Sequence, residues 1–139
     1  MKAMYTAKAS VSGGRQGTAD VEGAQSFDLA MPKEMGGTGE GMNPEQLFAA
    51  GYAACFQSAM MHVAMSQKLK ADDSTVEAHV SIGENDAGPG FKLAVKMAVT
   101  LPSLDQSAAQ ELVDTAHAVC PYSNATRGNI DVDFAVAGK

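Results

Sequence analysis

Two cysteines, Cys55 and Cys120, are the residues of this chain whose chemistry is most informative. Cys55 follows an alanine-rich stretch, and Cys120 directly precedes Pro121. They form no CxxC pair and the three histidines are scattered, so the sequence has no spacing typical of a zinc site. A cysteine in an apolar stretch is most often a small core residue. Reactivity at Cys55 therefore depends on the groups around it.

A reactive Cys55 needs a cation close to its sulfur. Only the thiolate is nucleophilic, an ordinary thiol has a pKa of about 8.5, and burial raises that pKa. Lowering the pKa by about 2 units requires about 2.7 kcal/mol of stabilisation. Arg15 is the candidate, because glycines at both ends of segment 13–17 allow a loop to fold back over a pocket. A solvated arginine on a hairpin turn is the ordinary alternative. Arg127 is the competing cation and is more typical of a surface or capping residue.

Glu45 is the acid that could orient Arg15. The helix dipole alone also favours an acid in a first helical turn, so both interpretations stand. Glu45 and Cys55 are about ten residues apart, or about 15 Å along one helix, and one chain does not easily bring them together. If two antiparallel helices cross near Ala50, Glu45 of one copy comes level with Cys55 of the other. We therefore predict an active site shared across a dimer.

Cys120 is expected to be the less reactive thiol. It lies at the end of a predicted helix, and the negative end of a helix dipole disfavours a thiolate. This position suits a resolving role, in which Cys120 attacks an oxidised Cys55. A buried structural cysteine is the alternative.

Two helices are predicted to carry these residues. Asn43 and Pro44 supply a cap and a first-turn proline for a helix from Pro44 to about Leu69. This helix is apolar nearly all round over residues 47–56, which predicts burial on all sides, either in a large core or against a second copy. Segment 46–67 is long enough for a bilayer span, but its polar residues favour a buried helix. A capping-box pattern at 103–106 begins the second helix, which Pro121 ends at Cys120.

Alternating apolar residues predict strands over 76–82, 91–101 and 130–136, of which the first two form an antiparallel hairpin. Weaker strand signals lie near residues 4–11, 18–22 and 26–30. The glycine-rich segment 36–41 lacks the lysine of a phosphate loop and is interpreted as a mobile flap. We predict an α+β fold in which mostly antiparallel sheets wrap around a long buried central helix.

Length and charge limit the other possibilities. A chain of 139 residues fits a single domain spanning 1–139, and a net charge of −6 disfavours nucleic acid as a partner. No leader or membrane segment is evident, so we expect a cytoplasmic protein that does not bind membranes. An apolar helix in so small a chain favours a homodimer with the helices crossing at its centre. A monomer whose sheet wraps the helix is the alternative.

Two long motifs and one short one resemble the organic hydroperoxide resistance family, within the superfamily of osmotically inducible protein C. The long motifs are segments 43–56 and 119–129, and the short one is segment 13–17. The resemblance spans essentially the whole chain, and segment 119–129 favours the organic hydroperoxide branch. It implies an intertwined homodimer and a thiol peroxidase that acts on organic and fatty-acid hydroperoxides.

The resemblance also implies the role of each candidate residue. Cys55 matches the peroxidatic cysteine, Cys120 the resolving cysteine, and Arg15 and Glu45 the activating pair. It implies no haem, flavin or metal cofactor, an intramolecular disulfide between the two cysteines, and a dithiol reductant, with lipoylated proteins the favoured donor. The alternative function is a dimeric binding module for apolar small molecules, in which Cys55 is structural.

Overall fold

The computed structural model describes residues 1–139, which form two compact units, Met1–Leu47 and Phe48–Lys139. The interpretation of the whole chain as one domain stays a prediction.

The first unit contains a small antiparallel sheet with the strand order β1-β2-β3. Its strands are β1 (Ala9–Ser12), β2 (Thr18–Val21) and β3 (Phe27–Asp28). The 3-10 turn η1 (Gly14–Gln16) joins β1 to β2. The first strand begins at Ala9, later than its sequence pattern suggests, because pairing with β2 extends only from Ala9 to Ser12.

The glycine-rich segment after β3 forms closed turns around η2 (Lys33–Met35). The backbone amides of Gly37 and Gly39 donate to the carbonyls of Pro32 and Met31. Met42 then forms a parallel bridge with Leu29, which returns the chain to the sheet. The mobility of this segment stays a prediction.

Helix α1 (Pro44–Ser66) begins where the sequence predicts. The Gln46 amide donates to Asn43 Oδ1 at 2.8 Å, and the Asn43 amide donates to Gln46 Oε1 at 2.9 Å, which is a reciprocal capping box. The helix ends earlier than the expected Leu69. Lys68 adopts a left-handed φ of 57°, and the Leu69 amide donates to the Ala64 carbonyl, so a Schellman-type turn terminates the helix.

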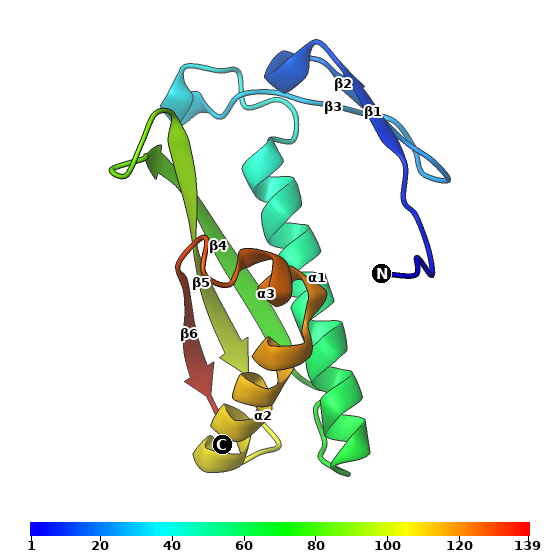
Figure 1. Ribbon diagram of the computed structural model, residues 1–139, viewed down its shortest axis with the longest axis vertical. Coiled ribbons are helices and arrows are strands. Elements are labelled where there is room, and N and C mark those ends of the chain that lie inside the picture. Colours follow the sequence, from blue (N-terminus) through cyan, green and yellow to red (C-terminus); the bar gives the residue numbers. More distant parts are fainter. The chain divides into compact units, whose positions relative to one another are not determined.

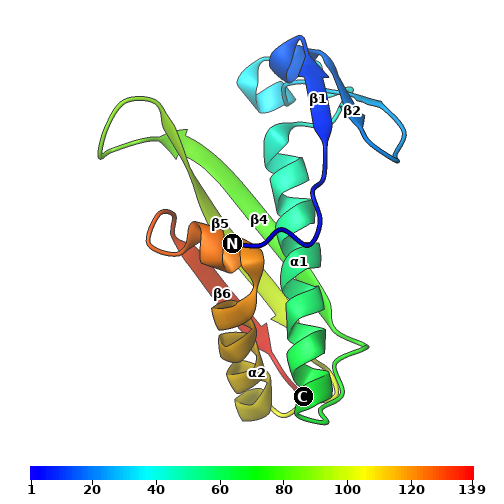
Figure 2. The ribbon, with the colours of Figure 1, turned by 45° about the vertical axis from the view of Figure 1, so that its right-hand side comes forward.

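The second unit contains a sheet with the order β4-β5-β6. Strands β4 (Thr75–Glu84) and β5 (Phe91–Thr100) form the predicted antiparallel hairpin. Strand β6 (Val132–Ala137) pairs with β5 in parallel, the one parallel pair among the named strands of a mostly antiparallel fold. A parallel pair requires a crossover, which α2 (Gln106–Val119) and the short α3 (Pro121–Thr126) provide. Helices α1 and α2 lie on the same face of this sheet (Figures 1 and 2).

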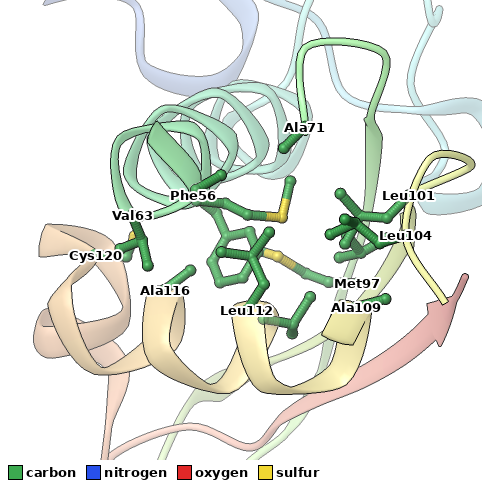
Figure 3. Close-up of a cluster of buried hydrophobic side chains, with 14 of the residues drawn as sticks. Phe56, Val63, Ala71, Met97, Leu101, Leu104, Ala109, Leu112, Ala116 and Cys120 are labelled. Atoms are coloured by element: carbon green, nitrogen blue, oxygen red, sulfur yellow. The ribbon is translucent and has the colours of Figure 1, made fainter. Parts of the chain in front are cut away.

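The core of the second unit lies between that sheet and the two helices (Figure 3). Alternate residues of β5 face it, and Val95, Met97 and Val99 are each 1% exposed. Only one face of α1 packs into the core, and Ala54, Met61 and Met65 are exposed in the single chain. The α+β class is thus confirmed, whereas burial of α1 on all sides is not reached within one chain. The homodimer that would cover its other face stays a prediction.

The start of α2 differs from the predicted capping box. Asp105 is the N-cap, and its carboxylate accepts a hydrogen bond from the Ala108 amide at 2.9 Å. Ser103 lies outside the helix and donates instead to Asp73 Oδ2 at 2.6 Å. The pattern therefore predicted the right region for the start of α2 but the wrong capping residue, because Asp105, two positions after Ser103, is also a capping side chain. None of the helices has the combination of length and apolar character that a membrane crossing requires.

Replacing Asp105 with alanine should lower the free energy of unfolding by about 1 kcal/mol, because the first turn of α2 loses its capping acceptor. Ser103→Ala is the matched control and should cost less than about 0.5 kcal/mol, because its hydrogen bond is exposed. Urea titrations followed by circular dichroism measure both. A larger loss for Ser103→Ala would contradict this assignment of the cap.

Candidate active site: an arginine–glutamate pair and two thiols

A tight glycine turn presents Arg15 between β1 and β2. Gly13 adopts a left-handed φ of 76°, which favours glycine. A Cβ on Gly17 would lie 1.7 Å from the Ser12 carbonyl oxygen, so no side chain fits there. These two glycines therefore allow the close turn that holds Arg15 in η1, as the sequence suggests.

Arg15 forms a bidentate ion pair with Glu45. Arg15 Nη1 donates to Glu45 Oε2 at 2.9 Å, and Arg15 Nη2 donates to Oε1 at 2.7 Å. The Glu45 side chain is 13% exposed and that of Arg15 is 37% exposed, so the carboxylate is the more enclosed partner. This fork geometry is the strong form of an arginine–carboxylate contact and fixes the plane of the guanidinium. The structure thus brings together two of the four predicted site residues, both within the first unit.

The ion pair shifts the pKa of both of its members. The hydrogen bond from Arg15 holds the pKa of the Glu45 carboxyl below its ordinary value, against the opposing effect of burial. The same hydrogen bond raises the pKa of Arg15. Glu45 therefore stays ionised, and the guanidinium is held by a charged partner.

The two cysteines meet in the second unit. Cys120 Sγ lies 3.7 Å from Cys55 Sγ, and both are free thiols. Cys55 is half-buried on α1, whereas Cys120 is fully buried. The structure therefore brings together the other two predicted site residues, although they are far apart in the sequence.

Cys120 lies at the junction between α2 and α3. It is the C-cap of α2 and also the N-cap of α3, with an extended backbone (φ −62°, ψ 126°). Pro121 explains both roles, because a proline disfavours helical geometry in the residue before it and is well suited to the first position of a new helix. The end of α2 was predicted from Pro121, but the helix that starts at the same residue was not.

Burial dominates the acidity of Cys55. It raises the pKa of the Cys55 thiol above the ordinary value, and the neighbouring Cys120 thiol raises it further. The backbone amide of Tyr122 acts in the opposite direction but does not compensate. The second unit by itself therefore favours the protonated thiol, which is the situation that calls for an added cation.

An aromatic group and a set of hydroxyls lie on the same segments as the two thiols, and neither was predicted from the sequence. Tyr52 packs against Phe48 and Tyr122, with ring centroids 5.9 and 5.7 Å apart. The Tyr52 hydroxyl lies 3.0 Å from both Ser123 Oγ and Thr126 Oγ1. The helical spacing of Ser123 and Thr126, directly after a cysteine and a proline, was the signal available in the sequence.

Arg127 matches the capping role expected for it. It is exposed, and Nη2 donates to the His117 carbonyl at 2.6 Å while Nη1 donates to Asn124 Oδ1 at 2.8 Å. Its guanidinium thus serves the carboxyl end of α2. No three His, Cys, Asp or Glu side chains are grouped in a way that could hold a metal ion.

Residues 37–135 match the protein family described as OsmC-like protein, so the chain belongs to that family. The organic hydroperoxide resistance protein of Xanthomonas axonopodis pv. citri is 49% identical to it, over 98% of this chain and 96% of the relative. The solved organic hydroperoxide resistance protein from Legionella pneumophila is 50% identical, with a TM-score of 0.92 over 98% of this chain and 99% of that one. The solved organic hydroperoxide resistance protein OhrB of Bacillus subtilis is 47% identical, with a TM-score of 0.87 over 96% of this chain and 99% of that one. The resemblance noted in the sequence is confirmed, and so is the fold.

Replacing Glu45 with glutamine should destabilise the protein in a pH-dependent way. The pKa of Glu45 in the folded state lies below its pKa in the unfolded state. The ion pair therefore stabilises the fold fully at a pH above the unfolded-state pKa, and this stabilisation is lost as the pH falls through the folded-state pKa. The difference in free energy of unfolding between wild type and Glu45→Gln should therefore be constant near pH 7 and shrink below about pH 4. Urea titrations between pH 3 and 7 measure it. A difference that grew as pH fell would contradict the ion pair.

Proposed function

We propose that this protein takes part in organic hydroperoxide resistance as a cysteine-based peroxidase that reduces organic and fatty-acid hydroperoxides to alcohols. The observation that carries the proposal is the 3.7 Å contact between the Cys55 and Cys120 thiols. Relatives that share about half of their residues with it, and cover nearly its whole length, are organic hydroperoxide resistance proteins, which supports the substrate class.

In the first step, the Cys55 thiolate attacks the distal oxygen of the hydroperoxide. An S–O bond forms, the O–O bond breaks, and the alkoxide takes up a proton and leaves as the alcohol. Cys55 is oxidised by two electrons to a sulfenic acid, and the hydroperoxide is reduced by the same two electrons. Cys55 suits this step better than Cys120 because it is the more accessible sulfur.

In the second step, Cys120 attacks the oxidised Cys55. An S–S bond forms, the S–O bond breaks, and the hydroxide leaves as water with the proton from the Cys120 thiol. A dithiol then reopens the bridge by two thiol exchanges and becomes a disulfide itself. Lipoylated proteins are the proposed donors.

The Arg15–Glu45 pair is proposed to supply the charge that ionises Cys55. Burial raises the pKa of that thiol, so ionisation at neutral pH requires a cation from outside its own unit. Arg15 suits this purpose, because its bidentate contact with Glu45 fixes the guanidinium while leaving it 37% exposed. A homodimer would let Glu45 of one copy act beside Cys55 of the other.

Apolar surroundings favour alkyl hydroperoxides over hydrogen peroxide. Cys55 is followed in α1 by the buried Phe56, and the aromatic group of Phe48, Tyr52 and Tyr122 lies in the same unit. An alkyl chain gains about 0.8 kcal/mol for each buried methylene, and hydrogen peroxide gains nothing of this kind.

Replacing either cysteine should separate the two steps. Cys55→Ser should abolish turnover of cumene hydroperoxide with dihydrolipoamide, because the nucleophile is lost. Cys120→Ser should consume about one equivalent of peroxide and then over-oxidise at Cys55, because no thiol resolves the sulfenic acid. Peroxide consumption measures the turnover of each variant, and intact-protein mass spectrometry measures the oxidation of Cys55. First-round activity in Cys55→Ser equal to that of wild type would rule out the proposal.

Replacing Arg15 should raise the pKa of Cys55. Iodoacetamide should alkylate the wild-type thiol at pH 6, whereas in Arg15→Gln alkylation should require a pH above the ordinary thiol pKa of about 8.5. Arg127→Gln is the matched control, because it removes the chain's other arginine at an exposed cap and should leave the titration unchanged. A wild-type thiol that is inert at pH 6 would instead fit the binding-module alternative.

A further inference from the structure

A buried cluster of three hydroxyls connects the segments that carry the two thiols. Tyr52 lies on α1, one helical turn before Cys55, and Ser123 lies on α3, one turn after Cys120. The Tyr52 hydroxyl is 3.0 Å from Ser123 Oγ and 3.0 Å from Thr126 Oγ1. Tyr52 and Ser123 are completely buried and Thr126 is 5% exposed, so solvent cannot substitute for these hydrogen bonds.

The direction of each hydrogen bond follows from the number of protons. Thr126 Oγ1 donates to the Ser123 carbonyl at 3.2 Å, which uses its only proton. Thr126 must therefore accept from Tyr52, whose own proton is then used. Ser123 must in turn donate to the Tyr52 oxygen. In this arrangement every hydroxyl in the cluster donates once, and all three groups hold it together.

The hydroxyl cluster is one of two tertiary contacts that hold helix α3, beside the packing of Tyr122 against Phe48 and Tyr52. With 6 residues α3 is far too short to be stable alone, so tertiary contacts must hold it. Its buried residues are Ser123 and Thr126, both polar and both bonded to Tyr52. Cys120 is the N-cap of α3, and a displacement of α3 therefore moves the Cys120 sulfur relative to Cys55.

We propose that the hydroxyl cluster of Tyr52, Ser123 and Thr126 positions Cys120 against Cys55 and so controls formation of the disulfide between them. The inference rests on the proposed function for its role in turnover, but the spacing it explains exists in the reduced protein. These three are positioning residues, because none of them contacts a reacting atom in the steps described above.

The cluster acts on one step of the proposed cycle and not on the other. Attack of Cys55 on the hydroperoxide requires no particular position of Cys120. Condensation requires the Cys120 sulfur to approach the oxidised Cys55 to the disulfide bond length of about 2 Å, forming S–S and releasing water. Loss of the cluster should therefore lengthen the life of the sulfenic acid and leave its formation unchanged.

The first test does not use peroxide. The equilibrium constant of the Cys55–Cys120 disulfide, measured in mixtures of reduced and oxidised glutathione, reports how well the fold holds the two sulfurs together. Tyr52→Phe and Thr126→Val should each shift this equilibrium about tenfold towards the dithiol, because buried hydroxyls lose their partners. Tyr5→Phe, at a position 82% exposed, is the matched control and should leave it unchanged.

Thr126→Ser separates hydrogen bonding from packing. Serine keeps the hydroxyl and loses the methyl group, whereas valine keeps the shape and loses the hydroxyl. The hydrogen-bonding role predicts a disulfide equilibrium within about twofold of wild type for Thr126→Ser and a shift of about tenfold for Thr126→Val. The opposite order, or no shift for Thr126→Val in a protein with wild-type circular dichroism, would overturn the inference. These two variants also decide the matter should Tyr52→Phe fail to fold.

The second test follows the peroxide reaction. After one equivalent of cumene hydroperoxide, dimedone trapping and mass spectrometry should show wild-type sulfenic acid formation in Thr126→Val and about tenfold slower disulfide formation, with more sulfinic acid in excess peroxide. Equal slowing of both steps would indicate a merely structural role and overturn the inference. If wild-type Cys55 reduces no peroxide, the proposed function fails, while the glutathione equilibrium still decides the positioning role.

Discussion

Ionisation of a half-buried thiol is unfavourable, and the proposed chemistry of Cys55 has to overcome this. Burial and the adjacent Cys120 both raise the pKa of Cys55, and the one backbone amide that opposes them is too weak. The second unit therefore brings two sulfurs together while keeping the Cys55 thiol protonated. The first unit contains a guanidinium held by two hydrogen bonds to a carboxylate, which the proposed function assigns to the ionisation of Cys55. Joining the two parts is what the proposed peroxidase requires, and neither part explains the other alone.

The crossover connection between the parallel strands β5 and β6 also determines where Cys120 lies. A parallel neighbour requires a crossover, and here the crossover is a helix, a proline break and a second short helix. A single continuous helix would have placed position 120 on a regular turn. The break at Pro121 instead gives Cys120 an extended backbone between two helices, where α3 can be held separately through its hydroxyls. The sheet topology and the spacing of the sulfurs therefore have a common origin.

Local patterns in the sequence predicted most of the elements and two pairs of candidate residues, whereas most other contacts between distant residues could not be predicted. Asn43 and Pro44 marked the start of α1 correctly, because a cap depends on neighbours in sequence. The capping box at Ser103 was wrong, because Asp73, which lies far away in sequence, binds that hydroxyl. The pairing of Arg15 with Glu45 and of Cys55 with Cys120 was expected from residue type and motif, and the structure shows both contacts. Their roles in chemistry stay a prediction. Tyr52 was missed because an apolar helix gives no sign of where a phenol finds its partner.

The unequal burial of the two thiols assigns an order to the proposed cycle. Cys55 is half-buried and Cys120 is fully buried, so a peroxide meets Cys55 first. The same difference applies to the return half of the cycle. A reductant thiolate approaches a disulfide along the line of the S–S bond, and in the reduced protein Cys55 is the more exposed sulfur. Attack at Cys55 of the proposed disulfide would release Cys120 as the leaving thiolate. In the proposed cycle, burial of Cys120 would protect that thiol from direct oxidation and would direct both oxidant and reductant to Cys55.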